Sequence, residues 1–174
     1  DAMANELVNG DFLETTAGAV TDPPSRWDAV VSSSIAGVPD GVSGPGLELS
    51  PSQPGYPSQF TYQNVLVRAG AEYRLEGYVK SGTSGNESFA IEVFSHNVGT
   101  KQLSIDGQTT ASWVNHSTSF IAPESQLSVV LRKNSPTVGT MLFDEVSLAE
   151  VDSAIERFRD QPDMFTEVIM SDGY

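Results

Sequence analysis

Short runs of alternating apolar and polar residues fill most of the chain, and turn-forming residues separate them. A period of two places the apolar side chains on one face of a half-buried strand. Many short strands with no helical pattern between them predict an all-β fold, a two-sheet β-sandwich. The runs are 59-QFTYQNVLV-67, 72-EYRLEGYVKS-81, 88-SFAIEVFSH-96, 101-KQLSID-106, 111-ASWVNHSTSFIA-122, 126-QLSVVLRKN-134 and 139-GTMLFDEVSLAEV-151.

The first third of the chain has a weaker strand pattern. Between residues 17 and 59, clusters of Gly, Pro, Ser and Asp predict long surface loops around short strands. Those short strands are 26-RWDAVV-31 and 46-GLELS-50. We expect one module over residues 5–150, preceded at residues 1–4 by a cloning scar or a processed end.

The last residues, 151–174, change to a helical pattern. Val151, Ile155 and Phe158 recur at helical spacing, and Ser153 with Glu156 forms a capping box. This pattern predicts a short helical appendage or linker. It either packs on the sandwich or docks a neighbouring domain or a second copy of the chain.

Composition limits the classes of partner. The 174 residues include 23 acidic and 9 basic ones, a formal charge of −14, and no cysteine. Such a field repels phosphate backbones and anionic lipid surfaces, so nucleic acid is excluded as an expected partner. No apolar stretch is long enough to insert in a membrane. The lack of cysteine does not fix the compartment. A Ser-, Thr- and Gly-rich acidic chain fits a secreted, extracellular or cell-surface protein, or a virion part, at least as well as a cytosolic enzyme.

Three of the predicted strands carry an unusual mixture on the face that alternation turns away from the core. Aromatic rings stand there among charged and amide groups, which is what a ligand groove requires and what a core or a purely solvated face rarely holds. We expect the three strands to be neighbours and to share this face. Its members are Arg74, Glu76, Tyr78 and Lys80, then Glu92, Phe94 and His96, then Arg132 and Asn134.

Several segments in order resemble the jelly-roll carbohydrate-binding modules attached to bacterial xylanases, cellulases and laminarinases. The resemblance covers roughly residues 5 to 150. The segments are 5-NELVNGDF-12, Trp27, 63-QNVLVRAGAEYRLEGYVKSG-82, Trp113 followed by Phe120, and 142-LFDEVSL-148. It implies a two-sheet jelly roll that holds a polysaccharide or oligosaccharide in a groove. Gln63 matches a glutamine near that groove, Trp113 belongs to the core, and Trp27 stays open. Tyr56 and Tyr62 are further candidate platforms for a sugar ring.

The same resemblance implies a structural calcium ion. Asp144 matches an aspartate of the final strand that turns toward calcium beside the N-terminal segment. The family places a glutamate directly after the phenylalanine, whereas here Leu13 follows Phe12. Asp11, Glu6 or Glu14 would then substitute as ligands. The alternative is that Asp144 accepts backbone hydrogen bonds at a turn.

Two other functions stay open beside noncatalytic carbohydrate binding. A polysaccharide lyase would use Tyr78, His96 and Arg132, and a glycosidase would need two facing carboxylates such as Glu76 and Glu92. We rank both below binding. Charged residues on an exposed sheet face are common, and Arg74 and Lys80 are available to neutralise the two carboxylates. A Ser-His-acid arrangement is unsupported, because no nucleophile motif is present. The third possibility is a structural or adhesive module, for example in a virion, with the same fold and no sugar site.

Overall fold

The computed structural model describes residues 5–7, 10–12, 27–29, 35–50, 59–83, 85–134 and 139–151. These residues form an all-β fold, as the alternating pattern predicts, and no helix occurs among them. The strands are β1 (Asp28–Ala29), β2 (Ile35–Val38), β3 (Gly46–Leu49), β4 (Gln59–Leu66), β5 (Glu72–Ser81), β6 (Ser88–Ser95), β7 (Lys101–Gln108), β8 (Val114–Ile121), β9 (Gln126–Lys133) and β10 (Met141–Glu150).

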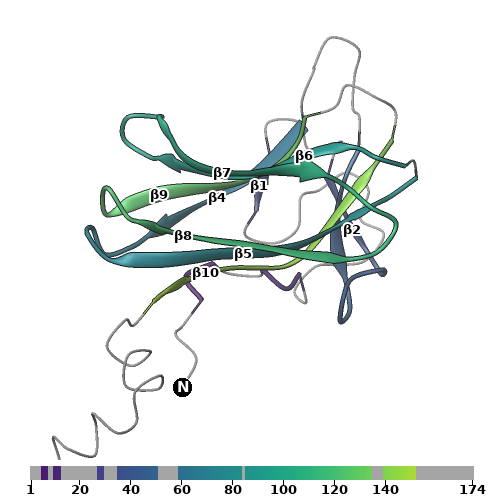
Figure 1. Ribbon diagram of the computed structural model, residues 1–174, viewed down its shortest axis with the longest axis horizontal. Coiled ribbons are helices and arrows are strands. Elements are labelled where there is room, and N and C mark those ends of the chain that lie inside the picture. The colour runs from purple at the N-terminus through teal and green to yellow at the C-terminus, as the bar shows by residue number, and fades with distance from the viewer. Residues whose placement is uncertain are drawn as a thin grey trace, which may run out of the picture.

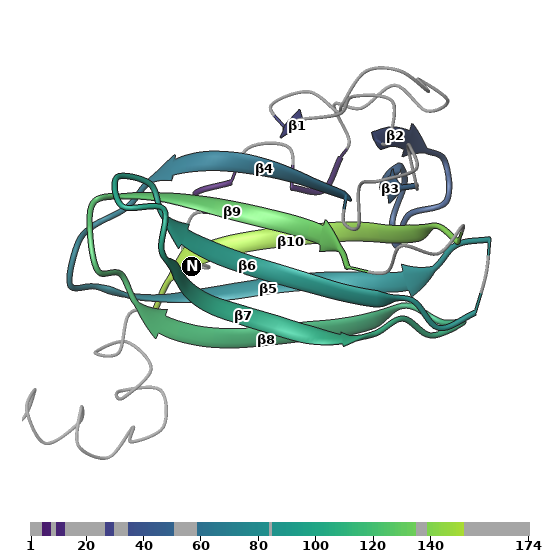
Figure 2. The ribbon, with the colours of Figure 1, turned by 90° about the horizontal axis from the view of Figure 1, so that it is seen from above.

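Two five-stranded antiparallel sheets make a jelly-roll sandwich. Sheet I has the strand order β1-β4-β9-β6-β7, and sheet II has the order β2-β3-β10-β5-β8. Figure 1 shows β4, β9, β6 and β7 above β10, β5 and β8, and Figure 2 shows the strands of sheet I side by side over those of sheet II. Strands that follow one another in the chain, such as β5 and β6, often belong to different sheets.

Alternation along the strands builds the core. In β5, Tyr73, Leu75 and Val79 are buried, and so are Ile91 and Val93 of β6. The inward stripes of these strands and of β9 are therefore as predicted. Burying a large apolar side chain contributes about 1.5–3 kcal/mol, so this stripe is what holds the two sheets together.

The two tryptophans occupy different environments. Trp27 is 2% exposed and its ring lies 5.8 Å from that of Phe12. Trp113 is only half-buried, and the ammonium of Lys80 lies 5.9 Å from its ring centroid. The prediction of Trp113 as a core residue is wrong, because the residue precedes the edge strand β8 instead of entering the sandwich.

One further difference concerns the first third of the chain. Ile35–Val38 forms β2, a strand that the Gly- and Pro-rich pattern around it conceals within predicted loops. The predicted helical appendage beyond Val151, and residues 1–4, lie outside the described residues. Among the residues the structure describes, no helix has the length and hydrophobicity needed to span a membrane.

Candidate ligand-binding faces

The predicted common face does not exist, because its three strands belong to two sheets. β6 and β9 are neighbours in sheet I, whereas β5 lies in sheet II between β10 and β8. Arg74, Glu76, Tyr78 and Lys80 therefore lie on the outer face of sheet II, and Glu92, Phe94 and Arg132 lie on the outer face of sheet I. Alternation assigns each side chain to the correct side of its own strand, but it contains no information about which sheet a strand joins.

Cross-strand register brings a new set of residues together on the outer face of sheet I. Phe60 of β4 pairs with Arg132 of β9. One row along, Tyr62 pairs with Val130, which pairs with Glu92 of β6. The members of these rows on β4 and β9 border a hollow of about 300 Å³, the ring-lined hollow. Its lining residues are Phe60, Tyr62, Phe94, Ser95, His96, Gly99, Ser128, Val130 and Arg132.

Three aromatic rings surround an apolar floor in the ring-lined hollow. The rings of Phe60 and Tyr62 lie 6.3 Å apart on β4, and Phe94 stands on β6. β9 runs between those two strands and contributes Val130, 5% exposed, to the floor. Since neighbouring strands lie about 4.8 Å apart, Tyr62 and Phe94 project from backbones separated by about 9–10 Å across the sheet. Phe60 was missed in the sequence, although its position two residues before Tyr62 places both on one face of β4.

An ion cluster borders the rings. Glu92 is 3% exposed. One of its carboxylate oxygens accepts a hydrogen bond from Arg132 Nε at 2.5 Å, and the other accepts one from Lys101 Nζ at 3.1 Å. The guanidinium of Arg132 lies 4.8 Å from the ring centroid of Phe60. Glu92, predicted to contact a ligand, therefore holds Arg132 and Lys101 in place. Lys101 was missed in the sequence, although it pairs with Phe94 across β6 and β7.

A carboxylate anchors the turn at one end of the ring-lined hollow. Glu124 accepts hydrogen bonds from Ser95 Oγ at 2.6 Å and from Asn97 Nδ2 at 3.1 Å. These hydrogen bonds, the one from Ser95 first, hold the pKa of Glu124 below its ordinary value. The turn carries His96, which is exposed, and Gly99 at a φ of 71°, which favours glycine. Glu124 therefore fixes the loop that presents His96 to the hollow.

Other predicted ligand residues lie elsewhere. Gln63 alternates onto the inner side of β4 and is 7% exposed, so it faces away from Phe60 and Tyr62. Asn134 is exposed beyond the end of β9, where its backbone N–H donates to the Ser88 carbonyl at 2.8 Å. Tyr56 lies outside the described residues. None of the three belongs to the described lining of the ring-lined hollow.

On the outer face of sheet II, the predicted residues are divided between two hollows. Glu76 and Tyr78 line one of about 440 Å³, together with Asp11 and Glu145. Lys80 lines another, of about 500 Å³. Glu76 also accepts a hydrogen bond from Asn115 Nδ2 at 3.2 Å, so neighbouring strands already satisfy part of its carboxylate.

Asp144 lies fully buried beneath a turn. A bulge beside it explains how β10 accommodates two adjacent carboxylates, Asp144 and Glu145. The register with β5 shifts between Asp144 and Ser147, and Glu145 adopts a φ of 50°. Asp144 accepts from the backbone N–H of Val42 at 2.6 Å and of Glu145 at 2.7 Å. Burial nevertheless raises the pKa of Asp144 above its ordinary value. The two carboxylates therefore have different environments, and the buried one carries a desolvation cost.

The surroundings of Asp144 fit a hard cation in part. A Cβ on Gly41 would lie 2.4 Å from Asp144 Oδ2, 2.4 Å from the Gly44 carbonyl oxygen and 2.7 Å from that of Pro45, so three oxygen atoms converge there. Calcium prefers such carboxylate and carbonyl ligands. However, the described residues contain no group of three or more His, Asp or Glu side chains able to hold a metal.

The structure describes two of the other predicted calcium ligands. The backbone of Glu6 pairs with Leu148, and Asp11 lines the hollow that Val42 and Glu145 border. Glu14 lies outside the described residues. The oxygen atoms shown to converge beside Asp144 are the main-chain carbonyls of Gly44 and Pro45.

Both predicted catalytic arrangements are separated by the sandwich. Tyr78 lies on the outer face of sheet II, whereas His96 and Arg132 border the ring-lined hollow on sheet I. Glu76 and Glu92 likewise stand on different sheets. Neither the lyase trio nor the glycosidase pair faces a common cleft.

Comparison with known proteins supports the fold. No protein-family model matches the sequence, and no curated protein does either. A family 61 carbohydrate-binding module solved with β-1,4-galactotriose is similar over 85% of this chain and 99% of its own, with 17% identity and a TM-score of 0.63. The chain has the fold of carbohydrate-binding modules.

Two other solved structures extend the comparison. The family 22 xylan-binding domain of Paenibacillus barcinonensis Xyn10C shares 16% identity over 88% of this chain and 98% of its own, with a TM-score of 0.62. The enzymatically active domain of bacteriophage CBA120 tailspike protein 4 shares 16% identity over 84% of this chain but only 21% of its own, with a TM-score of 0.56. The fold therefore occurs both as an isolated binding module and inside larger proteins.

Proposed function

We propose that this chain is a noncatalytic carbohydrate-binding module that holds a glycan in the ring-lined hollow of sheet I. The observation that carries the proposal is the meeting of three aromatic rings, an apolar floor and the guanidinium of Arg132, which Glu92 holds from beside the hollow, in one hollow. Similarity to a module solved with galactotriose and to a xylan-binding domain supports the same class of ligand. In this proposal the module works outside the cell, which is compatible with its Ser-, Thr- and Gly-rich acidic composition.

Stacking supplies most of the affinity in this proposal. Tyr62 is the register partner of Val130, and Phe94 is the partner of Ser128 one row further along, so the two rings lie diagonally across the floor. In this proposal the C–H faces of a pyranose ring pack against these aromatic faces. Each ring removes apolar ligand surface from water, and burying one large side chain is worth about 1.5–3 kcal/mol. Phe60 extends the platform along β4.

Polar groups around the rings orient the sugar. Arg132 and Lys101 donate to ring or hydroxyl oxygens while Glu92 holds them in position, and His96 adds a group at the turn. Ser104, the register partner of Glu92, has a buried hydroxyl without a hydrogen-bond partner among the described residues.

The test is retention on an array of defined oligosaccharides that includes β-1,4-galactotriose and xylohexaose. Tyr62→Ala and Phe94→Ala should each weaken binding about 10-fold to 100-fold, because 1.4 kcal/mol corresponds to a factor of ten. Leu66→Ala is the matched control, since Leu66 is 74% exposed on the same face of β4 and does not line the hollow. Equal binding by all three variants would refute the proposed site.

We also propose that Asp144 and the Gly44 and Pro45 carbonyl groups hold a structural calcium ion. The buried carboxylate carries a desolvation cost that a hard cation with oxygen ligands removes. In this proposal calcium secures the 41–45 turn against sheet II and takes no part in glycan recognition. Chelation should lower the thermal stability and leave the affinity of the folded protein unchanged.

The second candidate function is a structural module of a larger assembly. Similarity to part of a phage tailspike domain favours it. A structural module would show no retention on the array and no effect of Tyr62→Ala or Phe94→Ala. The array therefore decides between the two candidates.

A further inference from the structure

A second hollow, on the opposite side of the sandwich, is lined by charged and polar side chains that could contact a ligand. It measures about 500 Å³ and is larger than the ring-lined hollow. Glu48 of β3, Leu142 of β10 and Lys80 of β5 are register partners across three neighbouring strands and form its base. We call it the loop hollow. Its lining residues are Val38, Asp40, Glu48, Lys80, Ser81, Gly82, Thr83, Gly85, Asn86, Ala111 and Leu142.

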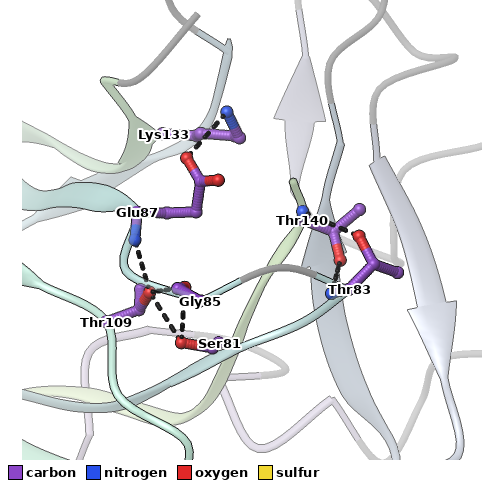
Figure 3. A network of polar contacts seen from close by, with 7 residues as sticks. All are labelled: Ser81, Thr83, Gly85, Glu87, Thr109, Lys133 and Thr140. Atoms are coloured by element: carbon purple, nitrogen blue, oxygen red, sulfur yellow. Dashed lines mark hydrogen bonds and ion pairs between the residues drawn. The ribbon is translucent and has the colours of Figure 1, made fainter. Parts of the chain in front are cut away.

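The wall of the loop hollow is fastened to β10 by reciprocal hydrogen bonds. Thr83 N–H donates to Thr140 Oγ1 at 2.9 Å, and Thr140 N–H donates to Thr83 Oγ1 at 3.3 Å. Gly82 N–H donates to the Thr140 carbonyl at 2.8 Å, and a Cβ on Gly82 would lie 1.9 Å from Thr140 Oγ1. Figure 3 shows Thr83 and Thr140 facing each other at this junction. Glycine is therefore required for the loop to approach so closely.

A buried polar network supports the same wall from inside. Ser81 Oγ donates to the Gly85 carbonyl at 2.9 Å, and Glu87 N–H donates to Thr109 Oγ1 at 2.9 Å. Glu87 Oε2 then lies 3.5 Å from Lys133 Nζ, in an ion pair whose side chains are 4% and 0% exposed. Ser81 Oγ also lies 2.9 Å from Thr109 Oγ1, so in Figure 3 the contacts run from Ser81 through Thr109 and Glu87 to Lys133. Such support pre-organises a wall, which a solvated surface loop does not need.

Charged groups in the loop hollow are left uncommitted. Among the described residues, no ion pair joins Lys80 to Asp40 or Glu48, and Lys80 contacts the ring of Trp113 instead. Only the centre of the base is apolar, where Leu142 lies between Glu48 and Lys80 and is 7% exposed. Polar groups that converge on a hollow in this way fix the orientation of a ligand.

We propose that the loop hollow is a second saccharide site, so that the module binds glycans on two opposite faces. This inference rests on the proposed function, because it assigns the same class of ligand. The carboxylates of Glu48 and Asp40 accept from vicinal hydroxyl groups, and Lys80 and Asn86 donate to ring or hydroxyl oxygens. An anionic ligand is disfavoured, since the hollow holds two carboxylates and one ammonium.

The position of the two hollows has a consequence for the ligand. They lie on the outer faces of different sheets, with the buried core of both sheets between them. One short oligosaccharide cannot reach both. The module would therefore bridge two chains of an insoluble polysaccharide, or bind one long chain at two separate places, with a gain in avidity.

The test counts binding sites per chain by isothermal titration calorimetry, with β-1,4-galactotriose, xylohexaose and any oligosaccharide retained on the array as probes. We expect two sites in the unmodified protein. One should remain after Glu48→Ala with Lys80→Ala, one after Tyr62→Ala with Phe94→Ala, and none after all four changes. Arg74→Ala is the control, because Arg74 lies on the same face of β5 outside the loop hollow. Thermal unfolding verifies that each variant is folded.

The possible outcomes separate this inference from the proposed function. A single site that disappears with Tyr62→Ala and Phe94→Ala, and is unaffected by Glu48→Ala and Lys80→Ala, overturns the second site and leaves the proposed function intact. A single site that disappears only with Glu48→Ala and Lys80→Ala supports the loop hollow and overturns the ring-lined one. No binding of any probe overturns both.

Discussion

The ring-lined hollow and the loop hollow both contain charged residues, but they arrange these charges in opposite ways. On sheet I, Glu92 is buried and both of its oxygens are engaged, by Arg132 and Lys101. On sheet II, Lys80 and Glu48 line one hollow without pairing to each other among the described residues. Paired charges act as supports for neighbouring side chains, whereas unpaired ones stay available to a ligand. Residue type alone therefore does not tell a contact residue from a positioning residue.

The same two faces also differ in how their buried or anchored carboxylates respond to acid. Glu124, beside the ring-lined hollow, has a lowered pKa because side-chain and backbone donors stabilise its charged form. Asp144, beneath the turn on sheet II, has a raised pKa because burial disfavours the charge more than its backbone donors favour it. Acid should therefore weaken the hydrogen bonds that the Glu124 carboxylate accepts. It should also remove the desolvation cost of the Asp144 carboxylate by protonating it.

The largest effect is expected from the ion pair that supports the loop hollow. Lys133→Met leaves the buried carboxylate of Glu87 without its cation and should cost about 3–5 kcal/mol of unfolding free energy. Urea denaturation measures the change. Adding Glu87→Leu should restore most of the stability, because it removes the uncompensated charge. A loss within about 0.5 kcal/mol for Lys133→Met alone, the range of surface changes, would show that the pair is not a support.

Glu92→Gln tests whether the ion cluster positions the ring-lined hollow. An amide keeps the shape of the side chain but weakens its hold on Arg132 and Lys101. We expect about a tenfold loss of glycan affinity, equal to about 1.4 kcal/mol, with little change in the far-UV circular dichroism. Glu48→Gln, on the other sheet, is the control and should leave this site unchanged. Unaltered affinity of Glu92→Gln would mean that Arg132 is held by Phe60 alone.

Asp144 links calcium to pH. Its pKa in the folded state is raised, so its contribution to stability is fully present below the unfolded value and is lost as the pH rises through the folded pKa. Calcium binds the ionised form, and at 100 times its Kd it would add about 2.7 kcal/mol. The calcium-induced rise in Tm should thus be largest at neutral pH, shrink on acidification and be absent in Asp144→Asn. A rise of equal size in Asp144→Asn would place the ion elsewhere.

The smallest effect is expected at Glu124. Because its folded pKa is lowered, its contribution to stability is present above the unfolded pKa and is lost as the pH falls through the folded value. Glu124→Gln should therefore flatten the acid side of the stability curve, measured as Tm against pH. Asp106, exposed on β7, provides the control substitution Asp106→Asn. Identical curves for the wild type and Glu124→Gln would contradict the anchoring role.

Much of the fold followed from the sequence itself. Alternation located β4 to β10 to within a few residues and identified the inward stripes of Tyr73, Leu75 and Val79 and of Ile91 and Val93. A period of two is a local property of the backbone, because successive side chains point to opposite faces whatever the rest of the chain does. For the same reason, alternation by itself places Phe94 and Arg132 on the outward side of their strands.

The site was decided by tertiary pairing. Whether Tyr78 stands beside Phe94 depends on which sheet β5 joins, and in this jelly roll it joins β10 and β8 instead of β6. Gln63 and Trp113 were misplaced for related reasons, one turned between the sheets and the other at the start of an edge strand. Strand partners here are distant in sequence and are selected by the packing of both sheets together, so no local pattern encodes them. The sequence determined the two sides of every strand, and only the folded chain determined which sides meet.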